Sequence, residues 1–136
     1  MSNTAQMALL TVCGVYSLGF AVFHAYFWRI FRWKNQLYLM HPANRAIVQI
    51  LNMRLIYVFV CMAGLCFFFP HALLETNLGH AVLAGCSLFW VGRTIEQFIY
   101  LRRIYHWVVH LLTAIFILGA LLFALPLFLS LLTPDS

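Results

Sequence analysis

Apolar residues run along this chain in four long blocks, separated by short clusters of polar and charged residues. The blocks cover residues 7–28, 46–69, 78–101 and 107–132. Each is longer than the ~18 apolar residues that mark a membrane-spanning helix. A helix satisfies its own backbone hydrogen bonds, as the hydrocarbon interior of a bilayer demands. The pattern therefore predicts an all-α integral membrane four-helix transmembrane bundle, with residues 1–136 forming a single domain.

The composition excludes a soluble globular domain. Hydrophobic residues fill 65% of the 136 positions and charged residues only 8%, against roughly 25% charged residues in soluble domains. A disordered chain is excluded too, because it needs low hydrophobicity and high charge. The net charge of +5 does not indicate nucleic-acid binding, which needs a water-exposed basic face on a soluble module. Membrane lipids are the expected surroundings.

The basic residues gather at one end of the predicted spans. The eight are Arg29, Arg32, Lys34, Arg45, Arg54, Arg93, Arg102 and Arg103. Glu75 and Asp135 lie at the other end, which lacks Lys and Arg. The positive-inside rule then places both termini and loop 70–77 outside, and loops 29–45 and 102–106 in the cytoplasm. Aromatic residues typical of an interfacial belt lie at the cytoplasmic end: Tyr26, Trp28, Trp33, Tyr100, Tyr105 and Trp107.

Polar side chains in the second span share one helix face. At 100° per residue, His41, Gln49 and Asn52 all fall within about 40° of Arg45, whereas Arg54 falls on the opposite face. Ionisable residues inside a span are costly and usually face the bundle interior or a water-filled cavity. This stripe therefore indicates a polar interior surface.

A second polar stripe lies on the third span. It consists of Arg93, Glu96, Gln97, Tyr100 and Arg103. Arg93 lies nine residues before Arg102, about 13 Å deeper at 1.5 Å per residue. If the two stripes face each other, they line a cleft open to the cytoplasm with more positive than negative charge.

Such a cleft favours an anionic, polar ligand, because Arg forms bidentate pairs with carboxylates. The alternative is that the polar groups only bridge neighbouring helices, at about 1 kcal/mol for each hydrogen bond. Arg93 and Glu96 would then be an i,i+3 pair within one helix.

The same two spans resemble a known family. The residues concerned are Asn44-Arg45-Ala46 followed by Gln49 and Asn52, and Phe89-Trp90-Val91-Gly92-Arg93 followed by Tyr100, Arg102 and Arg103. Over residues 29–132 the chain resembles the MAPEG family, the membrane-associated proteins in eicosanoid and glutathione metabolism. The resemblance implies a homotrimer of four-helix protomers that binds glutathione at the cytoplasmic side and receives a lipophilic substrate from the bilayer.

The resemblance also implies roles for individual residues. Glutathione, or a similar anionic thiol or peptide, would be bound by Arg45, Gln49, Asn52, Arg93, Glu96, Tyr100 and Arg103. The family's second span usually ends this motif with Glu where Asn52 stands, so Glu96 is expected to supply the negative charge. Arg29 or Arg32 takes the catalytic role, because nearby cations lower the pKa of a thiol from about 8.5.

The thiolate would attack a lipophilic electrophile or a hydroperoxide, as in a glutathione transferase or peroxidase. A different class of function is a non-enzymatic membrane subunit or lipid-binding scaffold. A third is a small b-type haem cytochrome with His24 and His110 as axial ligands from two spans at matching depth. No other metal site is expected, since His106 and His110 at i,i+4 lack a third ligand.

Small residues inside the spans indicate packing rather than chemistry. None of the four cysteines, Cys13, Cys61, Cys66 and Cys86, sits in a CxxC pair, and they are expected as small buried apolar side chains. Four glycines are expected at close helix contacts: Gly64, Gly79, Gly85 and Gly119.

Overall fold

The computed structural model describes residues 3–101, 103–104 and 106–133, and its long helices follow the apolar blocks. They are α1 (Asn3–Ala25), α4 (Pro42–Phe68), α6 (Asn77–Tyr100) and α7 (Trp107–Leu132). All four are long and apolar enough to cross a membrane, and the described residues contain no strand. The prediction of an all-α protein with four helices that could span a membrane is confirmed. Arg102, Tyr105 and Asp135, used above to assign the two ends, lie outside the described residues.

Four short helices complete the described fold. They are α2 (Phe27–Ile30), α3 (Trp33–Gln36), the 3-10 helix η1 (Leu37–Leu39) and α5 (Pro70–Glu75). The first three form a hairpin over residues 26–41, turned by Arg32 in the left-handed region at φ 48°. The end that carries this hairpin, the end of α6 and the start of α7 is called the basic end below, and the opposite end the α5 end.

Local sequence signals set where the long helices begin. Pro42 starts α4 four residues earlier than expected from hydropathy, because proline suits the first helical position. His41 caps this helix by accepting a hydrogen bond from the Ala43 amide through Nδ1 at 3.4 Å. Thr76 caps α6 in the same way, with Oγ1 2.9 Å from the Gly79 amide.

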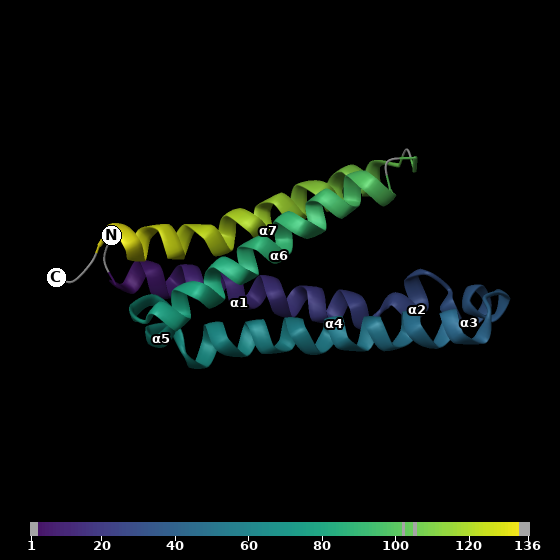
Figure 1. The fold of residues 1–136 in the computed structure, drawn as a ribbon, viewed down its shortest axis with the longest axis horizontal. Coiled ribbons are helices and arrows are strands. Elements are labelled where there is room, and N and C mark those ends of the chain that lie inside the picture. The colour runs from purple at the N-terminus through teal and green to yellow at the C-terminus, as the bar shows by residue number, and fades with distance from the viewer. Residues whose placement is uncertain (1–2, 102, 105, 134–136) are drawn as a thin grey trace.

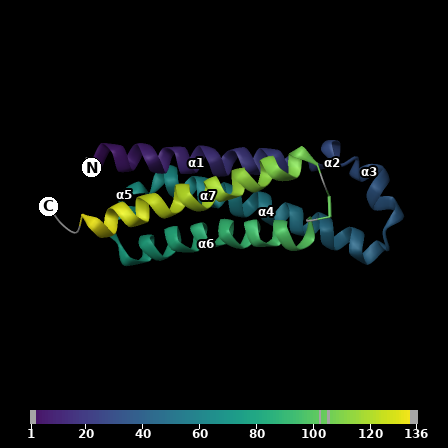
Figure 2. The ribbon, with the colours of Figure 1, turned by 90° about the horizontal axis from the view of Figure 1, so that it is seen from above.

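The long helices pack as two antiparallel pairs. Helix α1 lies along α4 and α6 lies along α7, while α1 also packs against α7. The pairs lie together near α5 and separate toward the basic end (Figure 1). In the view from above, all four run along one common axis (Figure 2). Helix α4 and α6 meet through the side chains of Phe59 and Trp90, whose rings stack with centroids 5.5 Å apart.

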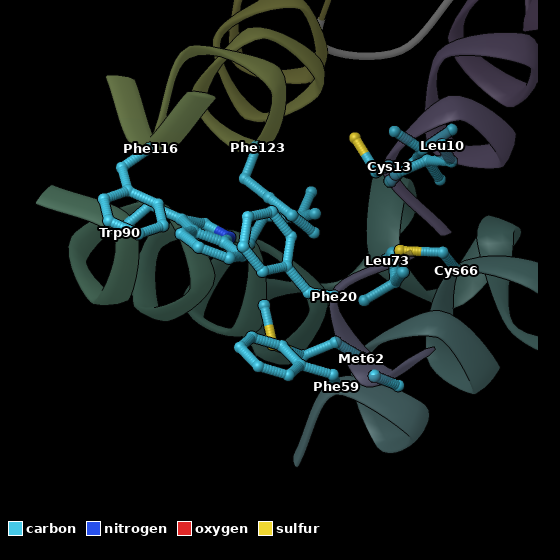
Figure 3. Close-up of a cluster of buried hydrophobic side chains, with 13 residues drawn as sticks. Leu10, Cys13, Phe20, Phe59, Met62, Cys66, Leu73, Trp90, Phe116 and Phe123 are labelled. Atoms are coloured by element: carbon cyan, nitrogen blue, oxygen red, sulfur yellow. The ribbon is translucent and has the colours of Figure 1, made fainter. Parts of the chain in front are cut away.

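Trp90 is the centre of the apolar core, with 1% of its surface exposed. Its ring contacts residues of the other three long helices, with centroids 4.6 Å from Phe20 and 5.8 Å from Phe116 (Figure 3). Tyr16 packs edge-on against it at 5.1 Å and donates a hydrogen bond to the Ile115 carbonyl at 2.6 Å. One aromatic layer therefore joins all four spans.

The small residues divide into two groups. A Cβ at Gly119 would meet the Tyr16 hydroxyl and the Trp90 ring, and one at Gly79 would meet the backbone of Leu73. Close packing is confirmed at these two positions. At Gly85 a Cβ would meet nothing within 4 Å, and at Gly64 only Phe68 at 4.0 Å, so these two glycines do not mediate close contacts between helices of the protomer.

The cysteines divide similarly. Cys13 and Cys66 are buried and Cys86 is half-buried, but Cys61 is exposed. The expectation of burial is thus wrong for Cys61, because this position falls on the face of α4 that points away from the bundle.

Candidate functional site

Arg93 lies on α6 within the membrane-spanning segment, one turn from the aromatic layer. Its guanidinium carbon is 4.8 Å from the centre of the Phe116 ring, a cation–π distance. Its Nη1 is 3.8 Å from Oε2 of Glu96, and the two side chains are 37% and 58% exposed. This long, partly exposed ion pair offsets only part of the cost of a charge inside a membrane span. Arg93 therefore retains capacity to bind an anion.

Two polar groups from the other helix pair also lie between the aromatic layer and the basic end. Asn52 of α4 is buried and donates through Nδ2 to the His24 carbonyl at 3.1 Å. The Nδ1 atom of His24 is 2.9 Å from the Phe20 carbonyl, and its ring stacks on Phe27 at 4.4 Å. We call His24, Asn52 and Arg93 the polar layer.

Unpaired polar atoms surround this layer. Trp90 Nε1, Asn52 Oδ1 and Gln97 Oε1 are buried without a hydrogen-bond partner among the described residues. Gln97 uses its other amide atom, Nε2, to reach the Val109 carbonyl at 3.3 Å. A buried polar group left unsatisfied costs about 1–3 kcal/mol. The unmet donor and acceptors favour a bound water or a polar ligand group at this level.

The remaining predicted ligand-binding residues lie nearer the basic end. Arg45 and Gln49 are half-buried, whereas Tyr100 is 79% exposed and Arg103 is exposed. Arg45 precedes Asn52 by seven residues, about 10 Å along the helix axis. Of the predicted α4 stripe, Asn52 is the residue nearest to the level of Arg93, and Arg45 lies in the first turn of α4, at the end where the helix pairs separate (Figure 1).

The two predicted catalytic residues, Arg29 and Arg32, are exposed on the hairpin, away from the polar layer. Arg32 lines an open pocket of about 580 Å³. The other lining residues are Ile30, Phe31, Trp33, Gln36, Leu37, Met40 and Val48. A role for either arginine beside a thiolate stays a prediction.

A second pocket is a lateral groove between α1 and α7, with a volume of about 510 Å³. Its walls are almost entirely apolar, and Gly19 widens it because no side chain projects there. Tyr16 and Phe20 form part of its lining and also contact Trp90. The groove therefore lies against the aromatic layer and suits a lipophilic ligand.

The histidines do not form an obvious pair. His24 is half-buried among aromatic rings, whereas His110 is exposed on α7. At 100° per residue, His110 is turned about 120° from the buried Phe116. Haem ligation by these two residues stays a prediction. Among the described residues, no three His, Cys, Asp or Glu side chains form a metal-binding group.

Several features of this region did not follow from the sequence pattern. The hairpin pocket does not follow from the sequence pattern, because nearly all of its lining lies in residues 29–45, which hydropathy assigns to a loop. Periodicity placed Gln97 on a polar stripe, but it did not show that Gln97 is 1% exposed while Tyr100 is 79% exposed. Periodicity shows which side of a single helix is polar. Only the packing of the helices shows which residues of that side are buried.

Comparisons with family models, with curated proteins and with solved structures found no match to this chain. The resemblance to MAPEG proteins therefore rests on the residues quoted above.

Proposed function

We propose that this protein binds an amphiphilic ligand from the basic end, with the anionic group at Arg93 and the apolar part in the groove between α1 and α7. The carrying observation is the position of Arg93, half-buried inside a span with Glu96 at 3.8 Å. The unpaired buried atoms of Trp90 and Asn52, both in this half of the bundle or at its border, favour a polar ligand group. The groove contacts the same aromatic layer through Phe20.

In its more specific form, the proposal is a MAPEG-like homotrimer that binds glutathione and acts on a lipophilic electrophile or hydroperoxide. Glutathione carries carboxylates, which suit the Arg93 guanidinium, and an ammonium group, which suits the Glu96 carboxylate. Asn52 has no charge to offer the ammonium. Glutathione itself would supply the thiol. The protein would then bind and orient glutathione and exclude water from the site.

The test is thermal unfolding of the detergent-purified protein with and without millimolar glutathione. A ligand at 100 times its Kd stabilises the folded state by about 2.7 kcal/mol. We expect an upward shift in Tm that is lost in Arg93→Leu and kept in Lys34→Leu, which removes an exposed cation from the hairpin. The assembled state of Arg93→Leu should be unchanged.

Equal shifts in both variants would remove Arg93 from the site, and no shift with glutathione would reject the specific form. A fatty acid, which is an anionic amphiphile, is then tested in the same way. A shift in Tm with this ligand would support the general proposal of an amphiphilic ligand. A Soret band in the visible spectrum of the same sample would instead support the haem alternative.

A second candidate is a non-enzymatic membrane subunit or lipid-binding scaffold. It is favoured by the way polar side chains connect helices: Tyr16 reaches Ile115 and Ser87 reaches Ala120, each through a carbonyl. Under this function, Arg93→Leu would disturb assembly rather than ligand binding.

A further inference from the structure

Two side chains of opposite charge point out of the bundle at one depth of the membrane. Arg54 on α4 is exposed, and Glu96 on α6 is 58% exposed. The stacking of Phe59 on Trp90 relates the depths of these two helices. Arg54 lies five residues from Phe59 and Glu96 six residues from Trp90, both toward the basic end. At 1.5 Å per residue, the two charges lie about 8 and 9 Å from the aromatic layer.

Both charges need a partner at this depth. Among the described residues, no carboxylate lies within ion-pair distance of Arg54. Glu96 is 3.8 Å from Arg93 but remains more than half exposed, so it has room for a second cation. Charged residues inside membrane spans usually pair with one another.

The face of α6 that carries Glu96 is shaped for a close helix contact. Ala81, Gly85 and Gly92 lie within about 40° of one another, and Glu96 lies beside them, within about 60° of each, at 100° per residue. A Cβ added at Gly85 or Gly92 would meet nothing within 4 Å. Small residues that let backbones approach closely are typical of helix interfaces in membranes. Within the protomer this surface, the glycine face of α6, has no helix against it.

The outward face of α4 offers a matching surface. Arg54, Tyr57 and Cys61 follow one another at i, i+3 and i+7, which places them on one side of the helix. Tyr57 is 62% exposed and Cys61 is exposed. These polar side chains project outward within a membrane-spanning helix.

We propose that a second copy of this chain docks along the edge formed by α4 and α6, with α4 of one copy on the glycine face of the other. Arg54 then pairs with Glu96 of the second copy. Rotation about an axis along the membrane normal leaves depth unchanged, so the two charges stay level between copies. Closed symmetry of this kind is the rule for homo-oligomers. A twofold dimer and a ring such as a trimer both contain this contact.

Disulfide trapping tests the contact with a cysteine that the chain already has. Cys61 lies two residues from Phe59 toward the α5 end, and Leu88 lies two residues from Trp90 in the same direction. Leu88 is 68% exposed. Under copper-phenanthroline oxidation, Leu88→Cys should give a crosslinked dimer that disappears when Cys61→Ser is added.

The matched control is Leu118→Cys on α7, which is 49% exposed. Phe116 packs on Trp90, so a cysteine two residues further along α7 lies at a similar depth. It should crosslink several-fold less than Leu88→Cys. Equal crosslinking of the two variants would indicate random collision and overturn the proposal.

Charge exchange tests the ion pair itself. Arg54→Glu and Glu96→Arg should each weaken self-association in nanodiscs about fivefold to thirtyfold, the effect of one or two lost interhelical polar contacts. The double variant should recover most of the association, measured by native mass spectrometry. The Arg93–Glu96 pair is broken in both Glu96→Arg and the double variant, so it cannot produce this recovery.

Unchanged association in the single variants, or a double variant as weak as the single ones, would overturn the proposal; Arg54 would then extend to the lipid headgroups instead. Failure of glutathione to bind would leave these results untouched, because they report assembly alone.

Discussion

The two halves of the bundle differ in how closely their helices pack and in where a charged side chain lies inside a span. Near α5 the helices converge, and Leu10, Cys13 and Phe123 have no exposed surface. Toward the basic end the pairs separate, and buried atoms of Asn52 and Gln97 lack partners, as Gln6 Nε2 does in the first half. Close packing stabilises the first half, whereas the second leaves a cation and several polar atoms available to a ligand. Substitutions in the two halves should therefore have different consequences.

The largest effect is expected where the two halves join, at Trp90. Trp90→Ala removes the ring that contacts Phe20, Phe59 and Phe116 and leaves a cavity. The free energy of unfolding should fall by about 3–5 kcal/mol, measured by thermal or denaturant unfolding in detergent. Phe128→Ala, at a 59% exposed position on α7, is the control and should cost much less. Equal losses would show that the aromatic layer does not hold the bundle together.

A smaller loss is expected at the α5 end from Gly79→Ala. The added Cβ would meet the backbone of Ala72 and Leu73, which cannot move as a flexible side chain can. Overpacking of this kind costs about 1–3 kcal/mol. Gly19→Ala is the matched control, because its Cβ meets nothing within 4 Å, and it should stabilise α1 by about 0.5–1 kcal/mol. Equal changes in the free energy of unfolding for Gly79→Ala and Gly19→Ala would contradict the close packing inferred for the α5 end.

The smallest effect on stability is expected in the basic half, from Asn52→Leu. It removes one unpaired oxygen together with one hydrogen bond to the His24 carbonyl. The net change in the free energy of unfolding should stay within about 1 kcal/mol. Ligand-induced stabilisation, measured on the same samples, should nevertheless decrease. A loss as large as that of Trp90→Ala would assign the polar layer to folding rather than binding.

The hydropathy of the sequence was sufficient to predict the four spans, because each helix must cover the hydrocarbon with apolar residues. It was less informative about helix ends: α4 begins at Pro42 because proline and the His41 cap outweigh hydropathy there. Helix α5 was not expected, since six residues give too short a pattern to distinguish it from a loop.

The candidate site could be predicted only as faces of single helices. Periodicity correctly grouped Arg93 with Glu96, which lie 3.8 Å apart. It could not show that His24 would join Asn52, because that contact depends on how α1 and α4 pack. The contact of Tyr16 with Ile115 was equally inaccessible, since it joins residues 99 positions apart.

The pairing of helices also has a consequence for the order of biosynthesis. The α1/α4 pair is complete before α6 is translated, and the α6/α7 pair forms from consecutive segments, so each can enter the bilayer as a helical hairpin. The bond from Tyr16 to Ile115 has to wait until α7 is inserted. Until α7 is inserted, the α1/α4 pair therefore exposes Tyr16 and Phe20 to lipid. Insertion of α7 then completes the bundle around Trp90.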